Sequence, residues 1–143
     1  MGVGVAVVCV LAWLVALSVY DIRQRRLPNW LTLPGAAVIL VTAVVHERGP
    51  PAALGAFALF AVYAVVHLAS PAEMGAGDVK LAIGIGALTA TFGADVWLLA
   101  ALGAPVLTAI WAVAALLRRS GRTVPHGPSM CLAAVTVIAL AAL

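Results

Sequence analysis

The placement of its few charged residues constrains this 143-residue chain more than any other feature. The 8 Lys or Arg and 5 Asp or Glu residues leave six long windows without charge. An apolar helix needs about 20 residues to cross the hydrocarbon core of a bilayer. Five windows reach that length and one, residues 81–94, is shorter. The windows are 1–20, 27–46, 49–72, 81–94, 96–117 and 123–143.

Backbone polar groups within lipid must be paired inside their own segment, so each window predicts a helix. We therefore expect an all-α, polytopic membrane protein with six transmembrane helices in one domain, residues 1–143. Only 9% of residues are charged, against about 25% in soluble domains, which excludes an ordinary soluble enzyme, a disordered chain and a nucleic-acid binder. The expected spans are 2–20, 31–45, 52–69, 78–93, 96–117 and 130–143.

The basic residues also predict an orientation in the bilayer. Seven of the eight follow the first, third and fifth expected spans, and only Arg48 follows the second. Because cytoplasmic loops carry the excess of Lys and Arg, we expect those three loops in the cytoplasm of an inner-membrane protein and both termini outside. The first window has its Arg residues after it and none before it, so it is expected to be a retained span and not a signal peptide.

Two acidic residues lie on the predicted cytoplasmic side at similar membrane depth. Asp21 ends the first expected span and Asp78 begins the fourth. Asp78 is four residues before Ala82, which with Gly86 and Ala90 forms a stripe of small residues, so Asp78 is expected to face a neighbouring helix. The simpler interpretations are a helix N-cap for Asp78 and, for Asp21, an ion pair with a nearby Arg such as Arg23 or Arg25.

A shared site would give these two carboxyl groups a specific chemistry. Two carboxylates in one low-dielectric site do not both ionise readily, so their pKa values separate. One group can then take a proton from water while the other protonates a peptide carbonyl. This is the arrangement of an aspartic protease, and it needs no metal or other cofactor.

Three segments resemble the motifs of one family. Residues 75–78, Gly-Ala-Gly-Asp, match the G-x-G-D motif of membrane-embedded aspartic proteases. Residues 21–29, Asp-Ile-Arg-Gln-Arg-Arg-Leu-Pro-Asn, resemble the D-x-R-x-x-x-I/L-P-N signature of bacterial type IV prepilin peptidases. Residues 124–128, Val-Pro-His-Gly-Pro, are similar to the P-x-G-P element before the last span of that family.

The resemblance implies that Asp21 and Asp78 are the catalytic pair of an endopeptidase in the bacterial cytoplasmic membrane. It implies that the partners are prepilin-like precursors, whose short basic leader is cut at the cytoplasmic face. Because water must reach the pair, we expect a cytoplasm-facing cleft formed by the first and fourth spans and closed by residues 21–30 and 70–78. Larger members carry a cysteine-rich cytosolic insert associated with methylation of the new N-terminus. This chain has no such insert, so we expect no methyl transfer.

Residues near the two acids are expected to support the site. Arg23 would orient Asp21 or simply set the topology, and Pro28 and Asn29 would shape the turn into the second span, with Asn29 as its cap. Gly75 and Gly77 would allow a close approach of the backbone to another helix or to substrate.

The remaining polar residues near these segments have simpler expected roles. Lys80 is expected to support the motif that contains Asp78 or, more simply, to reach lipid headgroups, and Glu73 either receives the basic leader or is a solvated loop charge. His67 is expected to be structural. His46 and His126 fall in loops with no metal-ligand spacing.

Two other functions use the same features. A small proton- or ion-coupled carrier would also need acids within the membrane, but it would place them near the midplane. An inactive pilin-assembly subunit would bind precursors without cutting them.

Overall fold

A computed structural model describes residues 2–143, and over that range the chain forms six α-helices and no β-strand. This confirms the all-helical fold expected from the charge-free windows. The helices are α1 (Gly2–Gln24), α2 (Asn29–Val45), α3 (Gly49–Ala69), α4 (Ala76–Ala90), α5 (Ala94–Leu117) and α6 (Gly127–Ala141).

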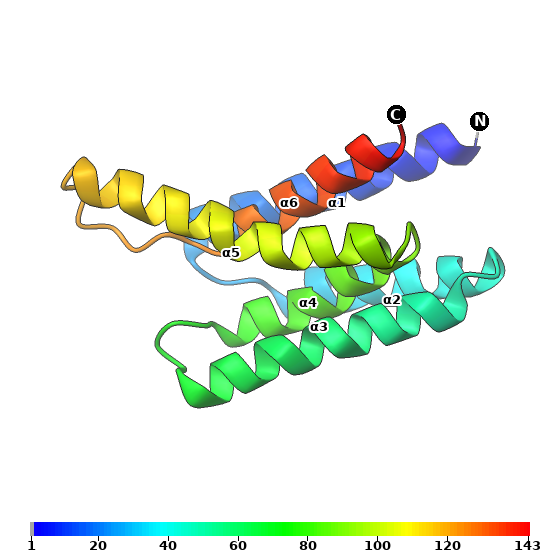
Figure 1. Cartoon of the computed structure of the whole chain (residues 1–143), viewed down its shortest axis with the longest axis horizontal. Helices are drawn as coiled ribbons and strands as arrows, with labels where there is room; N and C mark the ends of the chain where they lie inside the picture. The colour runs from blue at the N-terminus through cyan, green and yellow to red at the C-terminus, as the bar shows by residue number, and fades with distance from the viewer. Residues whose placement is uncertain (1) are drawn as a thin grey trace.

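The helices lie roughly along one long axis, and their connections divide between its two ends (Figure 1). The α2–α3 and α4–α5 turns share one end with the first and last helical turns of the chain. The other three connections, residues 25–28, 70–75 and 118–126, share the opposite end. These connections, or the helix ends beside them, carry the basic residues that were expected to face the cytoplasm.

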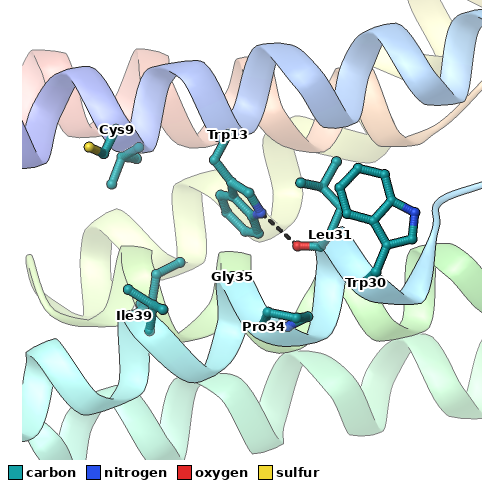
Figure 2. A pocket seen from close by; sticks show the side chains of 9 residues that line it. Cys9, Trp13, Trp30, Leu31, Pro34, Gly35 and Ile39 are labelled. Carbon is teal, nitrogen blue, oxygen red and sulfur yellow. Dashed lines mark hydrogen bonds between the residues drawn. The ribbon is translucent and has the colours of Figure 1, made fainter.

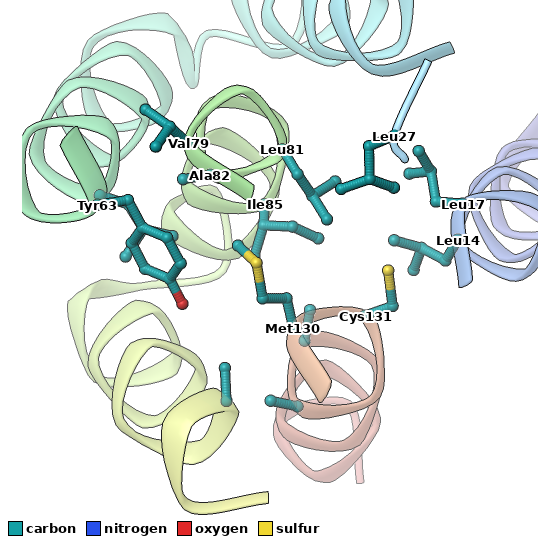
Figure 3. Close-up of a cluster of buried hydrophobic side chains, with 14 residues drawn as sticks. Leu14, Leu17, Leu27, Tyr63, Val79, Leu81, Ala82, Ile85, Met130 and Cys131 are labelled. Carbon is teal, nitrogen blue, oxygen red and sulfur yellow. The ribbon is translucent and has the colours of Figure 1, made fainter. Parts of the chain in front are cut away.

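The short helix α4 is the centre of the bundle and packs against α2, α3, α5 and α6. Most of its residues are buried, and Leu81, Ile85 and Ala82 belong to the main apolar core (Figure 3). The stripe of small residues on α4 packs on α3, because a Cβ added to Gly86 would meet the backbone of Gly55 and the side chain of Leu59. The predicted packing role of this stripe is therefore confirmed.

Fewer helices than windows have full membrane-spanning length. The helices α1, α3 and α5 are long and apolar enough to cross a membrane, whereas α2 and α6 are shorter apolar helices of 17 and 15 residues. The difference arises because the windows include non-helical chain. Pro28 is extended before α2, and residues 123–126 precede α6 without forming helix.

Trp13 joins α1 to the centre of the bundle. Its indole Nε1 donates a hydrogen bond of 2.8 Å to the carbonyl oxygen of Leu31 in α2 (Figure 2). Its ring occupies the space beside Gly35 of α2 and Gly84 of α4, where any Cβ would collide with it. The Trp13 ring thus packs where two glycines on different helices lack side chains.

We predict that Gly86→Ala destabilises the protein, because its new methyl group would collide with the Gly55 backbone. The expected loss is about 1–3 kcal/mol, typical of overpacking, and is measured as a lower thermal midpoint in detergent. Gly103→Ala is the matched control, because its Cβ would meet Ala133 at an ordinary 3.4 Å. Equal midpoints for the two variants would contradict this account of the α3–α4 contact.

Candidate active site

Asp21 lies inside the last turn of α1 and not in a loop, because α1 continues to Gln24. Its side chain is only 7% exposed. The Oδ2 atom accepts a hydrogen bond of 2.9 Å from the backbone N–H of Gly127, the first residue of α6. A buried carboxylate needs such a donor, since an unpaired buried charge is very costly.

Only glycine fits at position 127 in this arrangement. A Cβ there would lie 2.6 Å from Asp21 Oδ2 and 3.2 Å from its carboxyl carbon. The close approach of the α6 backbone to the carboxylate therefore depends on the missing side chain. It joins the end of the first helix to the start of the last one.

Asp78 lies in the first turn of α4 and is half-buried. The helix begins after Gly75, which is the N-cap and makes no side-chain capping bond, so the N-cap interpretation of Asp78 is wrong. The carboxyl group is close enough to Asp21 for their charges to interact. The structure thus brings the two expected acids to one place at the loop-rich end of the bundle.

The segment after α1 is held against α4 by two contacts. A Cβ on Gly77 would lie 3.0 Å from the Cβ of Leu27, so this glycine allows the expected close approach of the two backbones. Two residues further along α4, Lys80 Nζ donates a hydrogen bond of 2.8 Å to Asn29 Oδ1.

These contacts correct one sequence prediction, for Asn29, and give Lys80 a partner. Asn29 is the first residue of α2 and does not cap it; the N-cap is Pro28, with no side-chain capping bond. The ammonium group of Lys80, which was expected to support the motif or to reach headgroups, has a partner within the protein.

The other charged residues near Asp21 and Asp78 take no part in the two contacts between α4 and the segment after α1. Arg23 and Glu73 are exposed, and over residues 2–143 neither makes a side-chain hydrogen bond. Arg25, two residues further along, donates a bond of 2.8 Å to Thr123 in the last connection. His67 is bonded through Nδ1 to the carbonyl oxygen of Met74, which agrees with its expected structural role.

His126 is the residue near the site whose role the sequence did not reveal. Its Nε2 lies 2.8 Å from the hydroxyl of Tyr63 in α3, and its Nδ1 lies 2.6 Å from Oγ1 of Thr108 in α5. His126 precedes α6, and burial lowers its pKa to about 4, so the imidazole is neutral near pH 7. The P-x-G-P resemblance identified this segment, but it did not predict the contacts of His126, which is the x of the motif.

The site is not the expected cleft between the first and fourth spans alone. The helix α1 packs chiefly against α6 and α2, and the start of α6 completes the surroundings of Asp21. Two apolar cavities, of about 280 and 270 Å³, lie between α1 and α2 and between α5 and α6, and neither is lined by Asp21 or Asp78. In the described part of the chain, no three His, Cys, Asp or Glu residues come together as metal ligands.

The fold defines an all-helical membrane protein with two acidic side chains brought together at one end. A family model described as the Type IV leader peptidase family matches residues 8–143, so the chain belongs to that peptidase family. Neither the search of curated proteins nor the search of solved structures gave a match.

If Asp21 is catalytic, as proposed below, Gly127→Ala should lower peptidase activity by roughly tenfold or more, because a displacement of about 1 Å at a catalytic group can cost 100-fold. The added methyl group would push Asp21 away from the N–H that holds it. Activity per folded molecule is the measurement, and Gly4→Ala in α1 serves as the control, because its Cβ would meet nothing within 4 Å. Wild-type activity in Gly127→Ala would contradict the importance of this contact.

Proposed function

We propose that this protein is a membrane-embedded aspartic endopeptidase that cuts the short basic leader from type IV prepilin-like precursors at the cytoplasmic face. The observation that supports it most is the position of Asp21. In a chain of the leader peptidase family, this carboxylate is buried, held by the Gly127 N–H and within electrostatic range of Asp78.

The proposed reaction is direct hydrolysis by water between the two carboxyl groups. The ionised group takes a proton from water, whose oxygen attacks the carbonyl carbon of the scissile peptide bond, while the protonated group gives its proton to the carbonyl oxygen. Collapse of the tetrahedral intermediate breaks the C–N bond and moves a proton to the leaving amine. The products are a leader with a new carboxylate and a mature chain with a new amine.

The contacts around Asp21 suggest how its carboxylate would be oriented toward water. Its Oδ2 atom is occupied by the Gly127 N–H, which leaves Oδ1 for water. We assign supporting roles to Leu27 against Gly77 and to Asn29 with Lys80, because these contacts connect the segment after Asp21 to the helix that carries Asp78. Pro28, the N-cap of α2, has the extended conformation that this connection needs, and Gly75 is the N-cap of the helix that carries Asp78.

We place the protein in the bacterial cytoplasmic membrane as a multi-pass, single-domain protein with its termini outside. The basic loops gathered at one end support this orientation. The helix α5 continues for nine residues after Thr108, the neighbour of His126, which is about 14 Å at 1.5 Å per residue. The site therefore lies nearer the bilayer interior than the basic end of α5 does. Arg23 is exposed and would set the topology or meet solvent.

Substitution of either acid tests the proposal directly. Purified wild-type protein in lipid should shorten a model substrate with a basic leader and a hydrophobic helix, whereas Asp21→Asn and Asp78→Asn should each lower the rate by roughly 1,000-fold or more, as losses of essential catalytic groups do. The rate is followed as the appearance of the shorter product on a gel.

Asp95→Asn is the matched control, because Asp95 is an acid at the opposite end of the bundle, in the first turn of α5. It should cut at the wild-type rate. An intact precursor with wild-type protein, or cleavage by both Asn variants, would refute the peptidase proposal and favour a carrier or an inactive assembly subunit.

Cysteine labelling tests the orientation. In a background of Cys9→Ala and Cys131→Ala that retains the fold, Ser120→Cys should react with a membrane-impermeant maleimide only in inverted vesicles, because position 120 lies in the basic last connection. Glu47→Cys, in the α2–α3 turn, should react in spheroplasts. The reverse pattern would contradict the proposed topology.

A further inference from the structure

The position before Gly127 is occupied by a residue that connects three helices. His126 lies at the start of α6, and its ring is bonded to Tyr63 of α3 on one side and to Thr108 of α5 on the other. The P-x-G-P pattern leaves this position open, and the proposed reaction gives it no task. Its backbone is nevertheless joined directly to the amide that holds Asp21.

The hydroxyl protons fix how the ring is bonded. Thr108 Oγ1 also lies 3.1 Å from the carbonyl oxygen of Ala104 in its own helix. If Thr108 donates to that carbonyl, then His126 Nδ1–H donates to Thr108 Oγ1, and Nε2 accepts from the Tyr63 hydroxyl. Every proton then has an acceptor, whereas in the other tautomer the Tyr63 O–H has none among the hydrogen bonds of residues 2–143. A neutral imidazole with its proton on Nδ1 satisfies the network.

We propose that His126 is a positioning residue for Asp21, which it serves through the backbone by holding the Gly127 N–H between α3 and α5. The inference rests on the proposed function, since it assigns a task to the residue beside the catalytic contact. His126 touches neither water nor substrate in this role. It transfers no proton and acts as a bridge that accepts one hydrogen bond and donates another.

The geometry explains why this backbone needs to be held from the side. The residues before His126 form an irregular connection that is exposed as far as Thr123, where Arg25 bonds to it, and only Pro125 beside His126 is buried. The helices α3 and α5 are long, and Tyr63 is buried in the core. Two bonds from one ring to two rigid helices fix the Gly127 amide more firmly than the connection does.

Two substitutions of His126 separate a bridge from a proton carrier. His126→Ala should lower kcat by roughly 10- to 100-fold with little change in KM, because a misplaced catalytic group affects the reaction step. His126→Gln should remain within about threefold of wild type, since an amide can accept from Tyr63 and donate to Thr108 but does not titrate. If kcat of His126→Gln falls as far as that of His126→Ala, the positioning role is refuted in favour of proton transfer.

The partners provide a second test. Thr108→Val should lower kcat several-fold on its own but add little to His126→Ala, because residues in one network have non-additive effects. Thr108 is a cleaner variant than Tyr63, which also lies within electrostatic range of Asp78. Thr136→Val is the matched control, since Thr136 is an exposed helical threonine bonded only to the carbonyl of Leu132. Full additivity of Thr108→Val and His126→Ala would overturn the proposal.

A measurement that needs no activity separates this inference from the peptidase proposal. The amide of Gly127, observed by NMR in nanodiscs, should exchange with deuterium slowly in wild type and His126→Gln and much faster in His126→Ala. Slow exchange in all three would refute the positioning role. If wild type cuts no substrate but His126→Ala exchanges fast, the peptidase proposal fails while the bridge stands.

Discussion

The hydrogen bond from the Gly127 N–H to Asp21 is the contact on which the site depends. It joins residues 106 positions apart, at the end of α1 and the start of α6. The bond requires a glycine, because a side chain would occupy the position of the carboxylate. Since α4 packs against α6, and α1 does so as well, the same contact fixes Asp21 relative to the helix that carries Asp78.

An apolar bundle sets strict conditions for its polar groups. Water is scarce inside, so buried donors and acceptors must satisfy one another. Over residues 2–143 no buried side-chain nitrogen or oxygen lacks a hydrogen-bond partner. Trp13, Thr89 and Trp97 achieve this by donating to backbone carbonyls. Asp21 follows the same rule, since its Oδ2 atom accepts the Gly127 N–H, and it does so within electrostatic range of a second acid, Asp78.

The sequence predicted the helices and their grouping well, because charge placement and apolar length are local properties of the chain. It predicted boundaries less well: Asp21 lies within α1, since nothing in the sequence stops that helix before Gln24. The bonds of Asn29 to Lys80 and of His126 to Tyr63 and Thr108 were not predictable. They depend on how helices that are distant in sequence pack together, and hydrophobic periodicity does not predict that packing. The P-x-G-P segment was recognised by resemblance, but its contact with Asp21 required the structure.

The central claim is that the two carboxyl groups activate water directly, and oxygen labelling tests it most sharply. Excess purified protein in lipid would cut a prepilin-like substrate once in ¹⁸O-labelled water, and the released leader would be analysed by mass spectrometry. Direct attack by water predicts that the new carboxylate of the leader carries one ¹⁸O atom in this first turnover. An unlabelled leader, with ¹⁸O in Asp21 or Asp78 instead, would show that a carboxylate attacked the peptide bond and would contradict the account.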